Sequence, residues 1–202
     1  MLKLYYAPAA CSLAPHILLE ETKLPFELVK VDLRAKTFSG GDYYKINPKG
    51  SVPALQVNSG EILTETAIIL QYVADQKPET NLIPRAGTWE RYRCQEWLNF
   101  IASEIHKGFG PLWKPDTPAE YKPIALKNLT QKLNFVNAYL EKNNYLMGSS
   151  YTVADAYLFT VINWSHFLKI DLSPWPNLLS FMGRIKERPA TLAALKAEGL
   201  MK

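Results

Sequence analysis

The sequence predicts a small mixed α/β domain followed by an all-helical domain. Strand-like and helix-like segments alternate over residues 1–80, whereas the later chain shows only apolar positions that recur at helical spacing. Between these parts, residues 77–87 hold two prolines and no periodicity, which is typical of a boundary. We therefore expect domains at residues 1–80 and 87–202, joined by a linker at residues 81–86.

The first domain is predicted to run in the order βαβ-ββα. Residues 2–7 are rich in Tyr and Leu and favour a strand, Ser12 can cap a helix that reaches about residue 22, and residues 26–31 alternate like a second strand. A right-handed crossover would make these two strands parallel. Residues 32–46 lack a clean period and are expected to be irregular, with one helical turn.

A hairpin and a helix are expected to complete this domain. Residues 54–57 and 62–63 flank Asn58-Ser59-Gly60, which is a hairpin signal, and Thr64 can cap the next helix. Before the hairpin, Pro53 donates no ladder hydrogen bond at the mouth of its strand. A cis Val52-Pro53 bond is one hypothesis, but only about 5–6% of such bonds are cis in folded proteins, so these residues alone favour a trans proline that ends a loop.

The second domain is predicted to contain long amphipathic helices. One begins near Thr88, and a later one opens at Thr152 with a capping-box pattern and is apolar on nearly every side, as in the middle of a bundle. Further helical patterns cover residues 126–140 and 178–185, and Pro189 begins or separates a last short helix.

Composition and charge exclude several classes of partner. The chain has 202 residues, 48% of them hydrophobic, and its net charge of +4 is scattered, which argues against a nucleic-acid surface. No apolar run approaches the roughly 20 residues of a membrane span, and the first residues favour a strand over a secretion signal. The two cysteines, Cys11 and Cys94, make neither a disulfide framework nor a metal site. We expect a cytoplasmic protein with no metal, membrane or nucleic-acid partner.

Two side chains are candidates for chemistry. Cys11 precedes a predicted helix, whose N-terminus would lower its thiol pKa, although a small buried side chain is equally open. His106 lies seven residues after Asn99, so with Ser103 it would form a polar strip that lines a cleft or simply faces solvent. Cys94 and the other histidines, His16 and His166, are expected to be packing or surface residues.

The motifs of this chain resemble one known family along essentially its whole length, the cytosolic glutathione transferases, and specifically the bacterial beta class. Six motifs in the same order carry the resemblance: Tyr6-x-x-x-x-Cys11-Ser12-Leu13-Ala14, Asn47-Pro48-Lys49-Gly50-x-Val52-Pro53-Ala54-Leu55, Thr64-Glu65, Glu96-Trp97-Leu98-Asn99, His106-Lys107-Gly108-Phe109 and Thr152-Val153-Ala154-Asp155-Ala156-Tyr157.

The resemblance implies a thioredoxin-like domain that binds glutathione as a substrate, a helical bundle domain, and a homodimer without a cofactor. It implies that the Val52 backbone pairs with the cysteinyl part of glutathione, that the bond to Pro53 is cis, and that Glu65 and Thr66 receive the γ-glutamyl end. It also implies a role for Lys36 at the glycine carboxylate. Further residues that it implies for the glutathione site are Asn99, Ser103, Glu104, His106 and Lys107, with Glu104 reaching the neighbouring subunit's glutathione.

The implied reaction is attack of the glutathione thiolate on a hydrophobic electrophile, with thiol-disulfide or peroxide reduction through a mixed disulfide at Cys11 as a further expectation. Which group activates the sulfur stays open among Cys11, His106, Ser12 and Tyr6, with His106 and Cys11 preferred. The alternative is a noncatalytic ligand-binding or transcription-associated adaptor of the same fold. Candidates for the electrophile site are Phe109, Trp113, Tyr157 and Trp164, and the Thr152–Asp155 pattern is implied to serve folding alone.

Overall fold

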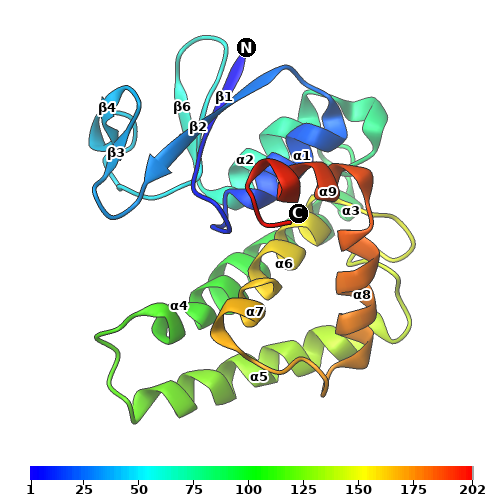
Figure 1. The fold of residues 1–202 in the computed structure, drawn as a ribbon. Helices are drawn as coiled ribbons and strands as arrows, with labels where there is room; N and C mark the ends of the chain where they lie inside the picture. Colours follow the sequence, from blue (N-terminus) through cyan, green and yellow to red (C-terminus); the bar gives the residue numbers. More distant parts are fainter. Residues whose placement is uncertain (202) are drawn as a thin grey trace. The chain divides into compact units, whose positions relative to one another are not determined.

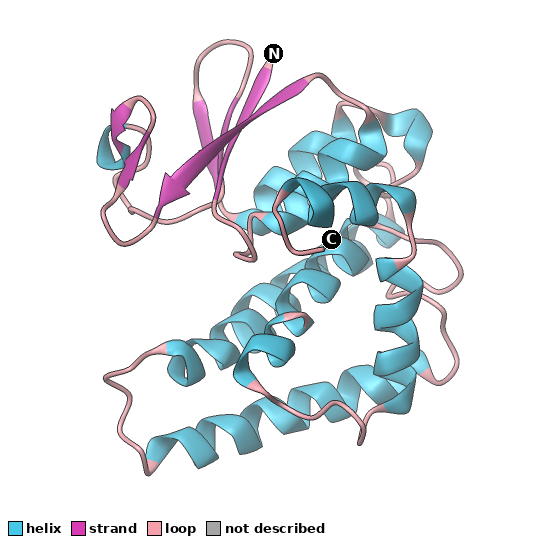
Figure 2. Ribbon diagram, in the orientation of Figure 1, coloured by secondary structure: helices cyan, strands magenta, loops and turns pink. Residues whose placement is uncertain are grey.

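The computed structural model describes residues 1–201, which form two compact units (Figure 1). The first unit combines Met1–Leu82 with the stretch that begins at Glu187, and the second is Ile83–Lys186. All six strands of the described chain belong to the first unit, whereas the second is helical (Figure 2). The predicted fold class, a thioredoxin-like α/β unit plus a helical unit, is confirmed.

The C-terminal limit of the second domain differs from the expectation of residues 87–202. The last helix, α9 (Pro189–Ala197), packs on α1 (Leu13–Thr22) of the first unit. Just before α9, the Arg188 guanidinium Nε lies 2.7 Å from a carboxylate oxygen of Glu21 in α1. Helical periodicity identifies a helix but not the surface that it covers, so the sequence pattern grouped α9 with the other late helices.

The first unit is built on one mixed sheet, with the strand order β4-β3-β2-β1-β5-β6. The central pair β1–β2 is parallel, as predicted from the crossover, and β5 pairs antiparallel with both β1 and β6. Helix α1 packs against α2 and α9, and Figure 1 shows the three together on one side of the sheet. The strands are β1 (Leu2–Tyr6), β2 (Phe26–Asp32), β3 (Thr37–Phe38), β4 (Gly41–Asp42), β5 (Ala54–Gln56) and β6 (Ile62–Thr64), and α2 is Thr66–Asp75.

The stretch expected to be irregular contains more structure than its pattern indicates. Besides the expected helical turn, a 3-10 helix at Tyr43–Lys45, it holds the two-residue strands β3 and β4. Strands this short cannot display alternation, so only the packing reveals them. Tyr43 is fully buried, and its ring lies 5.9 Å from that of Tyr5 and 6.5 Å from that of Phe38.

Two predicted helix caps of the first unit are wrong. Ser12 occupies the N-cap position of α1, but its hydroxyl makes no capping bond, because it is hydrogen-bonded to the backbone of Ala7. Thr64 ends β6, and the N-cap of α2 is Glu65, whose φ of 71° lies in the left-handed region. This backbone turn leads the chain directly from the strand into the helix.

The second unit is a helical bundle around α6. Every residue of α6 (Val153–Ile162) is buried, as its apolar sequence predicted, and the Thr152–Asp155 capping box is present. Thr88 caps α3 by accepting a hydrogen bond from the Arg91 backbone N–H. The other helices are α3 (Trp89–Phe100), a π-helix (Ile101–His106), α4 (Lys107–Trp113), α5 (Tyr121–Leu140), α7 (Trp164–Leu168) and α8 (Pro176–Lys186).

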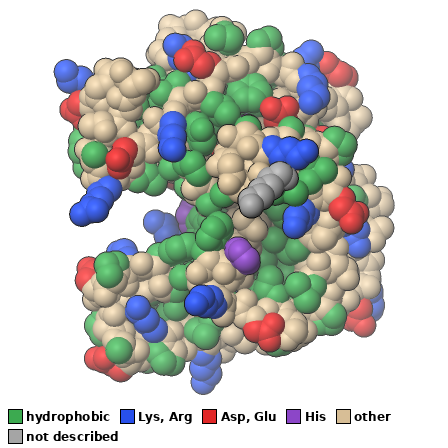
Figure 3. Space-filling view, in the orientation of Figure 1, with side chains coloured by type: hydrophobic (Ala, Val, Ile, Leu, Met, Phe, Trp, Pro, Cys, Tyr) green, Lys and Arg blue, Asp and Glu red, His purple; other side chains and the backbone are tan. Residues whose placement is uncertain are grey.

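The surface agrees with the scattered charge of the sequence. Figure 3 shows acidic and basic side chains interspersed over the visible face, with apolar side chains among them. Within the part of the chain that the structure describes, no helix is both long and apolar enough to cross a bilayer.

Candidate functional site

The first group of predicted site residues gathers where β1 ends and β5 begins. Because Tyr5 of β1 pairs with Ala54 of β5, the loop after β1 and the turn before β5 lie at the same edge of the sheet. The Cys11 thiol donates a hydrogen bond of 3.2 Å to the Val52 carbonyl oxygen, and the Val52-Pro53 bond is cis, as predicted.

The environment of Cys11 favours one of the two interpretations left open by the sequence, a buried and protonated thiol. Burial raises the pKa of the Cys11 thiol to about 11, and hydrogen bonds from the Thr66 side chain and from backbone N–H groups only partly oppose this. The side chain retains some exposed surface, yet its sulfur is desolvated, and desolvation disfavours the charged form. The protonated thiol therefore dominates at neutral pH, despite the adjacent helix N-terminus.

Ser12 and Tyr6 have other partners. The buried Ser12 hydroxyl donates to the Ala7 carbonyl and accepts from the Ala7 N–H, each at 3.2 Å. Burial raises the pKa of the Tyr6 phenol, and its ring centroid lies 6.2 Å from that of His16. These contacts do not favour either residue as the sulfur activator, and both assignments stay predictions.

Lys49 is a residue of this site that the sequence analysis did not single out. Its ammonium Nζ lies 2.5 Å from Oε1 of Glu65 and 3.0 Å from the Thr64 hydroxyl. Glu65, which is predicted to bind the ammonium of glutathione, thus already has a cationic partner. The neighbouring Thr66 is buried in the first turn of α2. The sequence showed a lysine inside the Asn-Pro-Lys-Gly turn, but only the folded structure shows that the Lys49 side chain reaches the start of α2.

Lys36, the residue just before β3, contacts the same turn. Its ammonium donates to the Gly50 carbonyl oxygen at 2.8 Å. Gly50 has a φ of 62°, and an added Cβ would lie 2.7 Å from a ring carbon of Tyr44, so the turn requires glycine here. Lys36, Glu65 and the Val52-Pro53 bond are therefore grouped around one turn of the first unit.

The remaining predicted residues lie in the second unit, where the helix geometry differs from the expectation. Ile101–His106 is a π-helix, in which the hydrogen bonds run from i to i+5, so the seven residues from Asn99 to His106 do not make two α-helical turns. The Ser103 hydroxyl donates to the Asn99 carbonyl at 2.9 Å. Nδ1 of His106 lies 2.7 Å from the Tyr157 hydroxyl.

Glu104 and Lys107 are exposed on this segment. A carboxylate oxygen of Glu104 lies 2.8 Å from Nζ of Lys132 in α5, so its expected role toward a neighbouring subunit stays a prediction. Four further aromatic rings form a chain near His106, since Trp164 contacts His106, Phe109 and Trp113, and Trp113 contacts Phe167. Three of the four proposed electrophile-site residues, Phe109, Trp113 and Trp164, belong to this chain, and the fourth, Tyr157, contacts His106.

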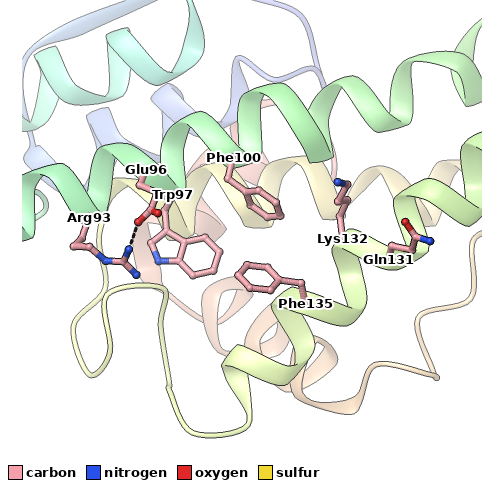
Figure 4. A pocket seen from close by; sticks show the side chains of 7 residues that line it. All are labelled: Arg93, Glu96, Trp97, Phe100, Gln131, Lys132 and Phe135. Carbon is pink, nitrogen blue, oxygen red and sulfur yellow. Dashed lines mark hydrogen bonds and ion pairs between the residues drawn. The ribbon is translucent and has the colours of Figure 1, made fainter.

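A separate pocket of about 350 Å³ lies between α3 and α5 of the second unit (Figure 4). The rings of Trp97, Phe100 and Phe135 meet there at centroid distances of 5.4–5.9 Å. The other lining residues are Arg93, Glu96, Gln131 and Lys132. None of the predicted site residues lines this pocket. No cluster of three or more potential metal ligands occurs within residues 1–201.

Comparison with known proteins identifies the family. Residues 1–75 match the glutathione S-transferase N-terminal domain, and residues 100–189 match the glutathione S-transferase C-terminal domain. Glutathione S-transferase GstA of Escherichia coli O157:H7 is 48% identical over 200 residues, covering 98% of this chain and all of that protein.

Solved structures agree. A sphingomonad glutathione S-transferase complexed with glutathione superimposes with a TM-score of 0.95 at 44% identity, covering 98% of this chain and 100% of the other. A beta-class glutathione S-transferase from Sphingomonas chungbukensis gives a TM-score of 0.95 at 48% identity with the same coverage. This chain therefore belongs to the glutathione S-transferase family of enzymes and to its bacterial beta class.

Proposed function

We propose that this enzyme transfers the glutathionyl group to an electrophilic carbon of a hydrophobic small molecule, with the new bond formed at the glutathione sulfur. The glutathione thiol loses its proton, the thiolate forms the new carbon–sulfur bond, and the leaving group departs with its bonding electrons. Glutathione is the substrate, and no cofactor takes part. The observation that carries the proposal is the Cys11 thiol, which burial keeps protonated and which donates to the Val52 carbonyl.

The first unit supplies binding groups for a tripeptide with two carboxylates and one ammonium. Glu65 pairs with the ammonium, and the Thr66 hydroxyl with the N-terminus of α2 receives the γ-glutamyl carboxylate. The backbone of Val52 pairs with the cysteinyl part, next to Cys11. Lys36, whose ammonium already lies at the Gly50 carbonyl, serves the glycine carboxylate.

The second unit supplies the group that stabilises the sulfur anion. His106 is the only titratable imidazole among the predicted site residues, and it stands beside the Trp164 ring at a centroid distance of 4.8 Å. We assign the thiolate-stabilising hydrogen bond to His106. The Cys11 thiol has one hydrogen, so it adds a second hydrogen bond only when it turns from the Val52 carbonyl toward the sulfur. Asn99, Ser103 and Lys107 complete the polar side. The exposed Trp113 ring provides apolar surface for the electrophile, supported by the buried rings of Phe109 and Trp164.

The raised pKa of Cys11 favours conjugation over disulfide chemistry. A mixed disulfide requires the Cys11 thiolate, because the thiolate and not the thiol attacks a disulfide sulfur. The protonated Cys11 is suited instead to donate a hydrogen bond. A noncatalytic adaptor would have no need of the grouped Lys36, Val52, Glu65 and Thr66.

Assembly as a homodimer in the cytoplasm is part of the proposal. Phe135 is 55% exposed beside the aromatic pocket between α3 and α5, and an apolar surface of this kind favours burial against a second copy. Glu104, on the π-helix that follows α3, is paired with Lys132 of α5, which also lines this pocket. Both cysteines are free thiols, as in a reducing compartment.

Two assays test the function together. We expect the protein to be retained on immobilised glutathione, to elute with free glutathione, and to conjugate glutathione to a chromogenic aryl halide with release of halide. Cys11→Ala should retain conjugating activity, because Cys11 is not the nucleophile. Glutathione binding without turnover in conjugation and disulfide-reduction assays would support the adaptor, and turnover of disulfides that Cys11→Ala abolishes would support the redox enzyme.

A further inference from the structure

The environment of His106 specifies more than the position of an imidazole. Nδ1 of His106 lies 2.7 Å from the hydroxyl of Tyr157, a residue of α6 that is only 2% exposed. The two rings meet edge to face, at 88° with centroids 5.9 Å apart. On another side, the Trp164 ring meets the imidazole at 72° with a centroid distance of 4.8 Å.

The hydrogen bond at Nδ1 decides which ring nitrogen carries the proton. In a neutral imidazole, one nitrogen is a donor and the other an acceptor, and the partner of one nitrogen fixes the state of the other. A phenol is a much stronger acid than a neutral imidazole N–H, so in this pair the phenol donates. Nδ1 of His106 then accepts, and the hydrogen of the ring is on Nε2.

We propose that Tyr157 is a positioning residue that holds His106 in the tautomer protonated on Nε2, so that the Nε2–H is the donor for the glutathione sulfur. The inference rests on the proposed function, because it assigns His106 to the sulfur. In this arrangement the thiol proton leaves to solvent, and the resulting thiolate accepts a hydrogen bond from Nε2. Without the Tyr157 hydroxyl, the ring can place its hydrogen on Nδ1 and turn an acceptor nitrogen toward the thiolate, which is repulsive.

The fold is suited to this task because Tyr157 is on a helix that is buried along its whole length. Every residue of α6 is buried, and the helix begins at the Thr152–Asp155 capping box. His106, by contrast, is the last residue of a π-helix, a local irregularity of the backbone that is frequent at functional sites. A fixed phenol therefore orients a ring on the less regular segment.

The test is the variant Tyr157→Phe, which removes one oxygen from a buried ring. In the wild-type protein without glutathione, nitrogen-15 NMR should show His106 with its hydrogen on Nε2, and in Tyr157→Phe the tautomers should be mixed. The pKa of bound glutathione, followed by thiolate absorbance, should rise by about one unit, because about a tenfold loss of thiolate corresponds to one unit. The acidic limb of the kcat/KM profile should move by the same amount, with KM for glutathione nearly unchanged.

Tyr139→Phe is the matched control, because it removes a tyrosine hydroxyl of the same unit that donates to the Leu146 carbonyl at 3.1 Å. It should alter neither the His106 tautomer nor the thiol pKa. Where Tyr157→Phe fails to fold, a fluorinated tyrosine at position 157 keeps the ring and strengthens the phenol as a donor, and should leave the Nε2 tautomer in place with an equal or lower thiol pKa.

The inference is overturned if the His106 tautomer does not change in Tyr157→Phe, or if the tautomer changes while the thiol pKa stays constant. A second variant separates these results from failure of the proposed function. If His106→Gln raises the thiol pKa and Tyr157→Phe does not, His106 acts without help from Tyr157. If neither variant raises it, the assignment of His106 to the sulfur is itself wrong.

Discussion

Nδ1 of His16 lies 2.8 Å from Oε1 of Glu198, and neither side chain has any exposed surface. The other carboxylate oxygen of Glu198 accepts a hydrogen bond of 3.0 Å from the backbone N–H of Ala9. Ala9 has a φ of 62°, an unfavourable conformation for a residue with a Cβ. One side chain that follows α9 thus holds both α1 and the loop that leads to Cys11.

Glu198→Ala should destabilise the first unit, because it leaves a buried imidazole nitrogen and a backbone N–H without their acceptor. Each buried group that loses its partner costs about 1–3 kcal/mol, so a loss of roughly 2–6 kcal/mol is expected for the two groups. Thermal unfolding should show a midpoint lower by roughly 5–15 °C. Glu187→Ala, at an exposed glutamate of the same stretch, should leave the midpoint within about 2 °C, and an equal midpoint in both variants would contradict the role of Glu198.

Alkylation of Cys11 should be slow and should accelerate only at high pH. With its pKa near 11, about one thiol in a thousand is ionised at pH 8, against roughly a quarter for an ordinary cysteine. The rate with iodoacetamide at pH 8 should therefore be roughly 200-fold below that of free cysteine. Measurement in Cys94→Ala isolates Cys11, because the chain has two cysteines. A rate close to that of free cysteine would show that Cys11 is ionised to an ordinary extent, and would support the alternative of redox chemistry.

Asp155 should make the stability of the second unit depend on pH. Burial raises the pKa of this carboxyl to about 7, although hydrogen bonds from the backbone N–H groups of Leu146 and Thr152 act to lower it. Since the unfolded value is about 3.9, the folded chain holds an extra proton between about pH 4 and 7. The contribution of Asp155 to the free energy of unfolding is therefore largest at low pH and falls as the pH rises through this window.

Asp155→Asn, which does not titrate, tests this dependence. It should be less stable than the wild type at pH 5 and at pH 8, because one of the two oxygens that accept from the Leu146 and Thr152 backbone N–H groups becomes an NH2 donor. The difference should be smaller at pH 8 by roughly 2 kcal/mol, since only the wild type loses stability between these values. Urea unfolding at both pH values checks the prediction, and a difference that grows with pH would refute the raised pKa.

Glu65 and Lys49 should affect glutathione binding in opposite directions. Glu65→Gln removes the charge partner of the ammonium, worth about 1.5–3 kcal/mol, and should raise the dissociation constant roughly 10- to 100-fold. Lys49→Met removes the cation that now contacts Glu65, and should lower the dissociation constant by up to about fivefold, because exposed ion pairs are worth at most about 1 kcal/mol.

Isothermal titration of both variants with glutathione provides the measurement, and Lys45→Met, at an exposed lysine of the neighbouring 3-10 helix, is the control. If Lys49→Met weakens binding, Lys49 contacts glutathione directly and does not compete with its ammonium for Glu65. If Glu65→Gln binds as tightly as the wild type, the ammonium has another receptor.

The sequence by itself determined the fold class, the order of the longer elements and the capping box of α6. These features depend on periodicity and on patterns of three or four neighbouring residues, all of which are local. The cis Val52-Pro53 bond was expected only from the resemblance to the family, because the local sequence favoured trans. The motifs also named the family, which the comparisons confirm.

Only the tertiary structure decided which groups act on one another. It joined α9 to α1 through Glu198 and His16, brought Lys49 to Glu65, and set Tyr157 against His106. It also decided the direction of the pKa shift of Cys11, because the helix N-terminus is visible in the sequence whereas desolvation depends on every segment that packs around the sulfur. Local pattern places a residue on an element, but burial and long-range contacts determine its chemistry.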